Sequence, residues 1–243
     1  GGYGNVFIIK IFLEDLSVAK YTFLYTLGGI MLLVANSLNQ VWSPYFYRIS
    51  KTMKHSSIEN ISKSYYTFLT IILSTIACAI VLLFKPLLMF FGGNLNIYSN
   101  YVFELALVFS SFIIYTPVWH CRNHLYLKTD GVDVLRLTIF SNFLGLIIMI
   151  LLIYFFKDIG IYLGLAALSL IQLIFFCDYA KKSFNSLFAF KSIIIGIALL
   201  LIFSLAAILN LSYVSYSIML VMLLFMGLFF LREHMPKIID MRK

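Results

Sequence analysis

Residues 134–177 read VLRLTIFSNFLGLIIMILLIYFFKDIGIYLGLAALSLIQLIFFC, and this stretch determines the class of fold. It contains two apolar runs, Val134–Phe156 and Ile159–Cys177, which are joined only by Lys157 and Asp158. Each run has about the 20 residues that a helix needs to cross roughly 30 Å of hydrocarbon. Lipid offers no partner for an unpaired backbone N–H or C=O group, so each run has to cross as a helix. The stretch therefore predicts two membrane-spanning helices with a very short connection.

Apolar runs of similar length recur along the rest of the chain. They are Tyr21–Val41, Tyr65–Phe84, Tyr101–Trp119, Ser192–Leu209 and Tyr213–Leu231. A shorter stub, Val6–Leu13, opens the chain and is interrupted by Lys10. The chain is 62% apolar and 12% charged, with a mean hydropathy of +0.99, whereas a soluble domain has about 25% charged residues. These features predict an all-α integral membrane protein with seven transmembrane helices and an N-terminal helix stub.

Three segments follow from this pattern. We expect a truncated helix end and an external turn over residues 1–20, the membrane helix bundle over 21–231, and a basic cytoplasmic tail over 232–243. Because the first residue is Gly1 and Val6–Leu13 is too short to span, we expect the chain to start partway through a transmembrane helix. The connections are short, so we expect no folded domain outside the membrane.

Lysine and arginine are concentrated in every second connection. These connections and the C-terminal tail hold 14 of the 18 basic residues, and Arg122 belongs to one of the connections. The other four basic residues are Lys10, Lys20, Lys85 and Lys157. Cytoplasmic loops have an excess of Lys and Arg, so we expect a multi-pass protein of the cytoplasmic (inner) membrane with a cytoplasmic C-terminus. The net charge of +8 is then a topology signal and a contact to anionic membrane lipid, and we expect no nucleic-acid partner.

Motifs for catalysis are absent from the sequence. There is no G-x-S-x-G, P-loop, G-x-G-x-x-G or H-E-x-x-H motif. Glu14 and Asp15 are adjacent, which is not the spacing of an acid/base pair across a substrate. His120 and His124 are one helical turn apart with only Cys121 near them, so we interpret them as an interfacial loop pair and not as a metal site. We therefore expect no enzyme activity, no cofactor and no metal.

Polar residues inside the apolar runs mark the candidate site, because a helix that faces lipid all round is uniformly apolar. In the first full run, polar residues from Thr22 to Ser43 recur every three or four positions and share a face. Weaker faces of this kind occur in three later runs, and they consist of Glu104, Ser111 and Tyr115, of Thr138, Asn142 and Gly145, and of Tyr162, Ser169 and Gln172. Such faces either pack against neighbouring helices through hydrogen bonds or line a wet cavity.

Seven residues are the candidates for a cavity wall. They are Lys10, Tyr25, Asn36, Asn39, Gln40, Glu104 and Asn142. Lys10 either faces water or an anion within the bundle or extends to the outer interface. Glu104 lies near the outer boundary of its run and is either a cavity residue or an interfacial one.

Three segments resemble bacterial polysaccharide flippases. Asn5–Tyr21 resembles the family's polar pair, short apolar run, turn and Val-Gly-x-Tyr, although Ala19 stands in place of the usual Gly. Asn36–Arg48 looks like the family's helix end, in which a Pro followed by aromatics leads into a basic loop. Asp158–Ser169 is similar to its Gly-x-x-Gly-Ala-Ala helix start. The likeness covers about residues 5–191 and rests on the order and spacing of loose motifs.

The resemblance identifies the chain as the C-terminal portion of an O-antigen or oligosaccharide-lipid flippase of the multidrug/oligosaccharidyl-lipid/polysaccharide exporter superfamily. It implies one lobe of a two-lobe protein around a central cavity, with a missing N-terminal lobe as partner. The implied activity is the flipping of polyprenyl-diphosphate-linked oligosaccharide repeat units for surface polysaccharide biosynthesis, by alternating access. In that activity the cavity amides suit sugar hydroxyl groups, and Lys10 can attract the diphosphate.

Other functions stay open beside this one. A cation-coupled drug exporter of the same superfamily would need acidic residues in its cavity, and only Glu104 qualifies. A membrane-embedded polysaccharide polymerase would be expected to have a large external loop, and an acyltransferase would need a His/Asp constellation at one membrane face. The sequence has neither feature. A purely structural membrane subunit is the remaining alternative.

Overall fold

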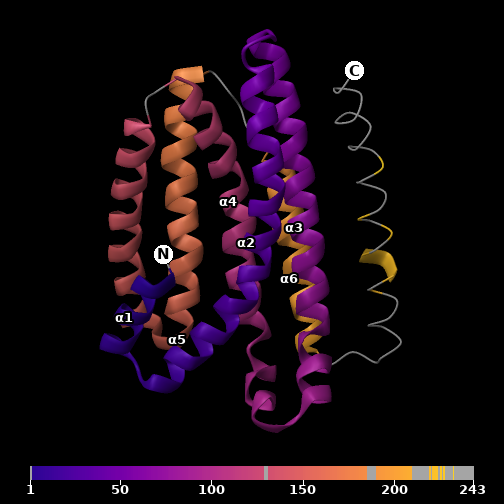
Figure 1. Cartoon of the computed structure of the whole chain (residues 1–243). Coiled ribbons are helices and arrows are strands. Elements are labelled where there is room, and N and C mark those ends of the chain that lie inside the picture. The colour runs from indigo at the N-terminus through magenta and orange to yellow at the C-terminus, as the bar shows by residue number, and fades with distance from the viewer. Residues whose placement is uncertain are drawn as a thin grey trace.

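The computed structural model describes residues 2–128, 131–184 and 190–209, and the positions 219, 221–223, 225, 227 and 232. In this part of the chain the regular structure is helical throughout (Figure 1). The elements are α1 (Gly2–Phe12), α2 (Asp15–Ile49), α3 (His55–Phe91), the 3-10 helix η1 (Gly93–Asn100), α4 (Val102–Lys128), α5 (Val132–Phe184) and α6 (Lys191–Ile208). The predicted all-α fold is confirmed for these residues.

Five of these helices are long and apolar enough to cross a membrane: α2, α3, α4, α5 and α6. α5 covers 53 residues and contains both runs of the stretch 134–177, as two helices that meet at a kink at Lys157. The last predicted run, Tyr213–Leu231, lies largely outside the described residues, and the tail 232–243 is described only at Arg232. The predicted count of seven transmembrane helices therefore stays a prediction.

α5 turns back on itself at Lys157, whose backbone has φ 50° and ψ −127°. Its first arm (residues 132–156) and its second arm (residues 158–184) lie side by side and antiparallel (Figure 1). Gln172 Nε2 of the second arm donates a hydrogen bond to Asn142 Oδ1 of the first arm at 2.8 Å. The ring centroids of Phe140 and Phe175 lie 5.3 Å apart across the same interface. The two adjacent apolar runs thus form a helical hairpin.

Small residues let the two arms of α5 approach closely. A Cβ atom at Gly164 would lie 2.6 Å from Met149 Cγ, and one at Gly160 would overlap the backbone carbonyl of Leu152. Gly160 and Gly164 form the G-x-x-x-G spacing that brings membrane helices together. The neighbour that this spacing accommodates is the first arm of the same hairpin.

The connections of the bundle lie at two ends (Figure 1). One end, which we call the basic end, has the C-termini of α2 and α4, both termini of α5 and the start of α6. The opposite end, which we call the far end, has the α1–α2 connection, η1 and the reversal of α5. Lys10, Lys20, Lys85 and Lys157 belong to segments at the far end. The charge alternation of the sequence thus becomes a difference between the two ends of the bundle.

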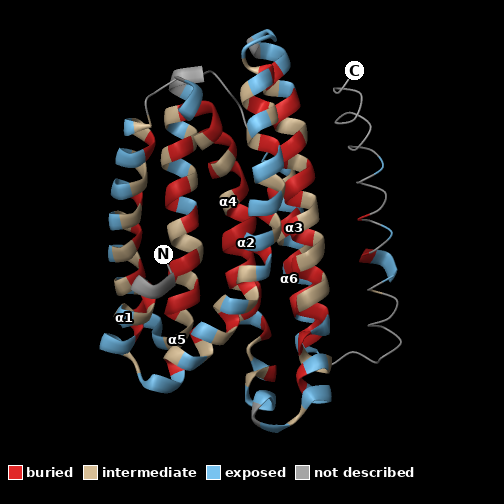
Figure 2. Cartoon of the chain, in the orientation of Figure 1, coloured by how far each residue is buried: buried red, intermediate tan, exposed pale blue. Residues whose placement is uncertain are grey.

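α4 is the centre of the bundle. It contacts α2, α3, α5 and α6. In an apolar stretch of 18 residues of α4, 67% of the residues are buried. The same fraction is 28% for α2 and 22% for α5, so these two helices expose broad sides (Figure 2). Polar residues on the inner faces of α4 and α5 can therefore meet inside the bundle, whereas α2 presents much of its surface to its surroundings.

Candidate functional site

A pocket of about 610 Å³ lies between α1, α2, α4 and the two arms of α5. We call it the central pocket. The polar side chains that line it from α4 and α5 are Ser111, Tyr115, Thr138, Asn142, Ser169 and Gln172. These residues belong to the polar faces that the sequence shows in three separate runs, and the fold brings them together around one space.

The central pocket offers hydrogen-bonding groups without charge, since none of its described lining residues is ionic. The hydroxyl groups of Ser111 and Thr138 each donate to a carbonyl of their own helix at 2.6 Å, which leaves their oxygen lone pairs as acceptors. Gln172 donates to the Asn142 carbonyl oxygen. The amide N–H groups of Asn142 and the carbonyl oxygen of Gln172 then remain available as donors and acceptor.

Aromatic rings form another part of the wall of the central pocket. Tyr25 and Phe112 have ring centroids 6.2 Å apart, and the Tyr115 and Trp119 rings meet edge to face at 5.2 Å. Apolar and aromatic walls with a few convergent hydrogen-bonding groups are the usual composition of a ligand site. The arrangement suits a neutral ligand that can both donate and accept hydrogen bonds.

A guanidinium group lies at the edge of the central pocket. Arg122 Nη1 donates a hydrogen bond to Tyr115 OH at 3.1 Å, and Tyr115 lines the pocket. The Arg122 side chain is half-buried, and none of the ion pairs between described residues includes it. A cation in such surroundings favours an anionic partner. The sequence pattern assigned Arg122 to a loop, but α4 continues to Lys128 and so places Arg122 near the Tyr115 face.

The seven candidate residues are distributed over several parts of the molecule. Tyr25 and Asn142 line the central pocket. Lys10 is exposed at the far end, where its Nζ atom lies 3.9 Å from Asp15 Oδ1. Glu104 is half-buried near the start of α4 and is not among the residues that line the pocket.

Three members of the polar stripe of α2, Thr22, Asn36 and Gln40, are exposed, whereas its other members are half-buried. Thr22, Thr26, Asn36, Ser37 and Gln40 are all exposed, and none of them lines the central pocket. An amide in contact with hydrocarbon loses its hydrogen bonds to water without replacement, which is unfavourable. This side of α2 is mixed in character, because Leu33 and Val41 are exposed beside Asn36 and Gln40.

Asn39 belongs to a hydrogen-bond network between helices. Tyr66 OH donates to Asn39 Oδ1 at 3.3 Å, and Asn123 Nδ2 donates to Tyr66 OH at 2.7 Å. The three side chains come from α2, α3 and α4, and Tyr66 is fully buried. At this position the stripe packs helices together, which is one of the two alternatives that the sequence left open.

His120 and His124 are also buried between helices, with 1% and 2% of each residue exposed. Their ring centroids lie 4.6 Å apart, and Ser62 Oγ lies 2.8 Å from His120 Nδ1. The interpretation as an interfacial loop pair is wrong, because α4 continues through both residues to Lys128. Among the described residues, no group of three or more His, Cys, Asp or Glu side chains could hold a metal ion.

Over the part of the chain that the structure describes, the fold is helical with several membrane-length helices, and a polar pocket without charged residues in its described lining lies inside the bundle. No protein-family model matches this chain, and no curated protein or solved structure matches it.

Proposed function

We propose that this chain is part of a transporter that flips polyprenyl-diphosphate-linked oligosaccharide repeat units across the cytoplasmic membrane for surface polysaccharide biosynthesis. The main support is the central pocket, whose wall offers hydroxyl, amide and aromatic groups. None of the described residues that line this pocket is charged. Such a wall can replace the water around a neutral, hydroxyl-rich sugar. The resemblance of three sequence segments to polysaccharide flippases is the second support.

The physical problem for such a transporter is to carry a polar head group through hydrocarbon. Asn142 and Gln172 have hydrogen-bonding groups left for sugar hydroxyls, and the ring of Trp119 offers an apolar face to the sugar. Arg122 provides a positive charge for the diphosphate at the edge of the same pocket. In this proposal the basic end of the bundle lies in the cytoplasm, so the lipid-linked substrate meets the side rich in Lys and Arg first.

A second lobe completes the transporter in this proposal. The exposed side of α2, where Asn36 and Gln40 lie beside Leu33, is the surface that would face the second lobe. Alternating exposure of the central pocket to the two sides would move the substrate. Membrane lipid would cover the more apolar sides of the bundle.

The lining of the central pocket favours this function over the alternatives. A cation-coupled drug exporter would use carboxylate groups in its cavity, but no carboxylate is among the described lining residues, and Glu104 lies outside the pocket. A polymerase or acyltransferase would need an acid/base pair at its site, and the amides and hydroxyls of this wall do not titrate near neutral pH.

Flipping in proteoliposomes tests the proposal. The chain is reconstituted with its second lobe, and a fluorescent polyprenyl-diphosphate oligosaccharide reports the rate at which the head group changes side. Asn142→Leu and Gln172→Leu should each slow flipping by about 2- to 10-fold, because each removes a hydrogen bond of about 0.5–1.5 kcal/mol. Asn96→Leu, at an exposed residue of η1, is the matched control and should not change the rate.

Two results would count against this function. One is an unchanged flipping rate when Asn142 and Gln172 are both replaced by Leu in a protein of normal membrane abundance. The other is proton-driven efflux of a cationic dye by the parent protein without flipping of the oligosaccharide lipid, which would favour the drug exporter.

A further inference from the structure

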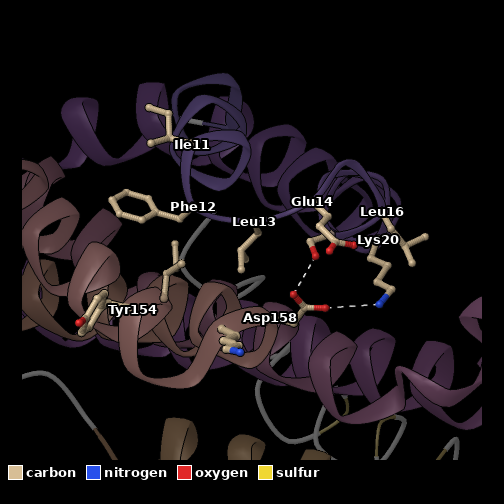
Figure 3. A pocket seen from close by; sticks show the side chains of 11 residues that line it. Ile11, Phe12, Leu13, Glu14, Leu16, Lys20, Tyr154 and Asp158 are labelled. Atoms are coloured by element: carbon tan, nitrogen blue, oxygen red, sulfur yellow. Dashed lines mark hydrogen bonds and ion pairs between the residues drawn. The ribbon is translucent and has the colours of Figure 1, made fainter.

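A second pocket lies at the far end of the bundle. It has a volume of about 550 Å³ and is bounded by the α1–α2 connection and the reversal of α5. We call it the far pocket. Asp158 of the reversal accepts hydrogen bonds from Ser17 Oγ at 2.7 Å and from Lys20 Nζ at 3.4 Å (Figure 3). These contacts join the start of α2 to the turn of the hairpin on one side of the pocket.

The same four helical segments line both pockets. Each segment contributes to the central pocket, and these residues include Asn5, Tyr25, Leu146 and Leu165. Each segment also contributes to the far pocket, and these residues include Ile11, Ser17, Ile153 and Asp158. On each segment the far-pocket residue lies one or more helical turns nearer the far end. The two pockets therefore follow one another along the bundle and do not open on unrelated faces.

Between the two pockets, each of these segments has large buried side chains. They include Ile9 of α1, Tyr21 of α2, Met149 of the first arm of α5 and Tyr162 of the second arm. These four residues are between 0% and 2% exposed. In the sequence, each lies between the central-pocket and far-pocket residues of its own segment. We call these four residues the barrier layer.

The barrier layer is held mainly by packing. Its rings include Tyr21 and Tyr162, whose centroids lie 6.5 Å apart. Asn5 Nδ2 of the central pocket donates a hydrogen bond to Tyr21 OH at 3.1 Å. Met149 fits against Gly164, where a Cβ atom would lie 2.6 Å from Met149 Cγ. Moving α2 away from the hairpin would open this layer, and it would also break the contacts of Asp158 with Ser17 and Lys20 at the far end.

We propose that the central pocket and the far pocket are two chambers of one path, and that the barrier layer closes the path between them. This inference rests on the proposed function, and it assigns the far pocket as a second site for the same hydroxyl-rich head group on the far side. Glu14, Lys157 and Asp158 give the far pocket charged groups that the central pocket lacks. The head group therefore leaves an uncharged chamber for a chamber with ionic groups and access to water at the far end.

Reaction of introduced thiols tests the barrier layer without any sugar. The native cysteines Cys78, Cys121 and Cys177 are replaced by Ala, and single thiols are placed by Ser169→Cys in the central pocket or Leu16→Cys in the far pocket. A small, charged methanethiosulfonate reagent is added to membrane vesicles on the side from which Leu16→Cys reacts. Ser169→Cys should then react much more slowly than Leu16→Cys.

Substitutions in the layer should open the path. Tyr21→Ala should raise the reaction rate of Ser169→Cys by about tenfold or more, because removing a buried ring weakens only the closed packing. Tyr21→Phe keeps the ring and should leave the rate near that of the parent. Phe23→Ala truncates a half-buried aromatic residue on the same helix outside the layer, and it is the matched control. Met149→Ala opens the layer from the opposite side and provides a second test if Tyr21→Ala reduces membrane abundance.

The outcomes separate this inference from the proposed function. Equal reaction rates for Ser169→Cys and Leu16→Cys in the parent would show that no barrier exists. If Tyr21→Ala and Met149→Ala raise the reaction rate of Ser169→Cys no more than Phe23→Ala does, Tyr21 and Met149 do not belong to a barrier. The thiol reaction needs no substrate, so it can detect a barrier even if Asn142→Leu fails to slow flipping. In the same way, Asn142→Leu can slow flipping even if the thiol reaction detects no barrier.

Discussion

Gly164 on the second arm of α5 packs against Met149 of the first arm, and one added methyl group there should destabilise the fold. A Cβ atom at Gly164 would lie 2.6 Å from Cγ, 3.0 Å from Cβ and 3.1 Å from Cα of Met149. Rotation of the Met149 side chain can move Cγ, but it cannot move Cβ or Cα, so the two arms themselves have to separate. Overpacking of this kind costs about 1–3 kcal/mol.

The net effect includes the helix preference of alanine. Replacing Gly by Ala inside a helix stabilises by about 0.5–1 kcal/mol. We therefore expect Gly164→Ala to lower the free energy of unfolding by about 1 kcal/mol after this gain is subtracted. Gly29→Ala is the matched control, because a Cβ atom at Gly29 would meet nothing within 4 Å, and it should raise the free energy of unfolding by about 0.5–1 kcal/mol.

The assay is unfolding of the purified chain by sodium dodecyl sulfate in mixed micelles, followed by the helical circular dichroism signal. A double variant with Gly164→Ala and Met149→Ala should be more stable than the sum of the single effects predicts, by about 0.5 kcal/mol or more, because the Cγ contact is gone. If Gly164→Ala is as stable as Gly29→Ala, the close packing of the arms at Met149 is refuted. If the two single effects add, the cost comes from Cβ and Cα of Met149 and not from Cγ.

Three further predictions concern other contacts. Cys121 Sγ and Cys177 Sγ lie 3.6 Å apart, so oxidation by copper phenanthroline should form a disulfide between them within one chain. If thiol titration still finds both cysteines free, the packing of α4 on α5 is contradicted. Asp158→Ala removes the hydrogen bond from Ser17 and should lower the free energy of unfolding by about 1.5–3 kcal/mol. Asp158→Asn keeps an acceptor for Ser17 and loses only an ion pair worth about 0–1 kcal/mol. Equal losses of stability for the two variants in the unfolding titration would contradict this difference. Arg122→Gln should slow flipping of the diphosphate-linked substrate more than Arg122→Lys, which keeps the charge, and equal rates in proteoliposomes would show that the charge is not used.

The helical class of the fold could be predicted because the length of an apolar run has a direct physical meaning in a bilayer. The sequence could not predict where helices end beyond the hydrocarbon. α4 continues through Arg122 to Lys128 and α2 continues through Pro44 to Ile49, because a polar segment can extend a helix that has already formed. For this reason Arg122 was assigned to a loop.

The candidate site was predictable in part for a related reason. Helical spacing shows which residues share a face, but not which neighbour that face meets. The polar faces with Ser111, Asn142 and Gln172 meet at the central pocket, whereas Asn36 on an equally regular stripe remains exposed. The direction in which a helix turns its polar face is decided by packing with the other helices.

The reversal of α5 has a consequence for how the protein enters a membrane. Both arms begin or end at the basic end, so a hairpin that inserts from that side must carry its turn through the hydrocarbon. The turn contains Lys157 and Asp158, which are adjacent and opposite in charge. Because their charges sum to zero, the turn can cross as a neutral pair, which is less unfavourable than moving a lone ammonium group. The two arms would then enter the bilayer as one unit during synthesis.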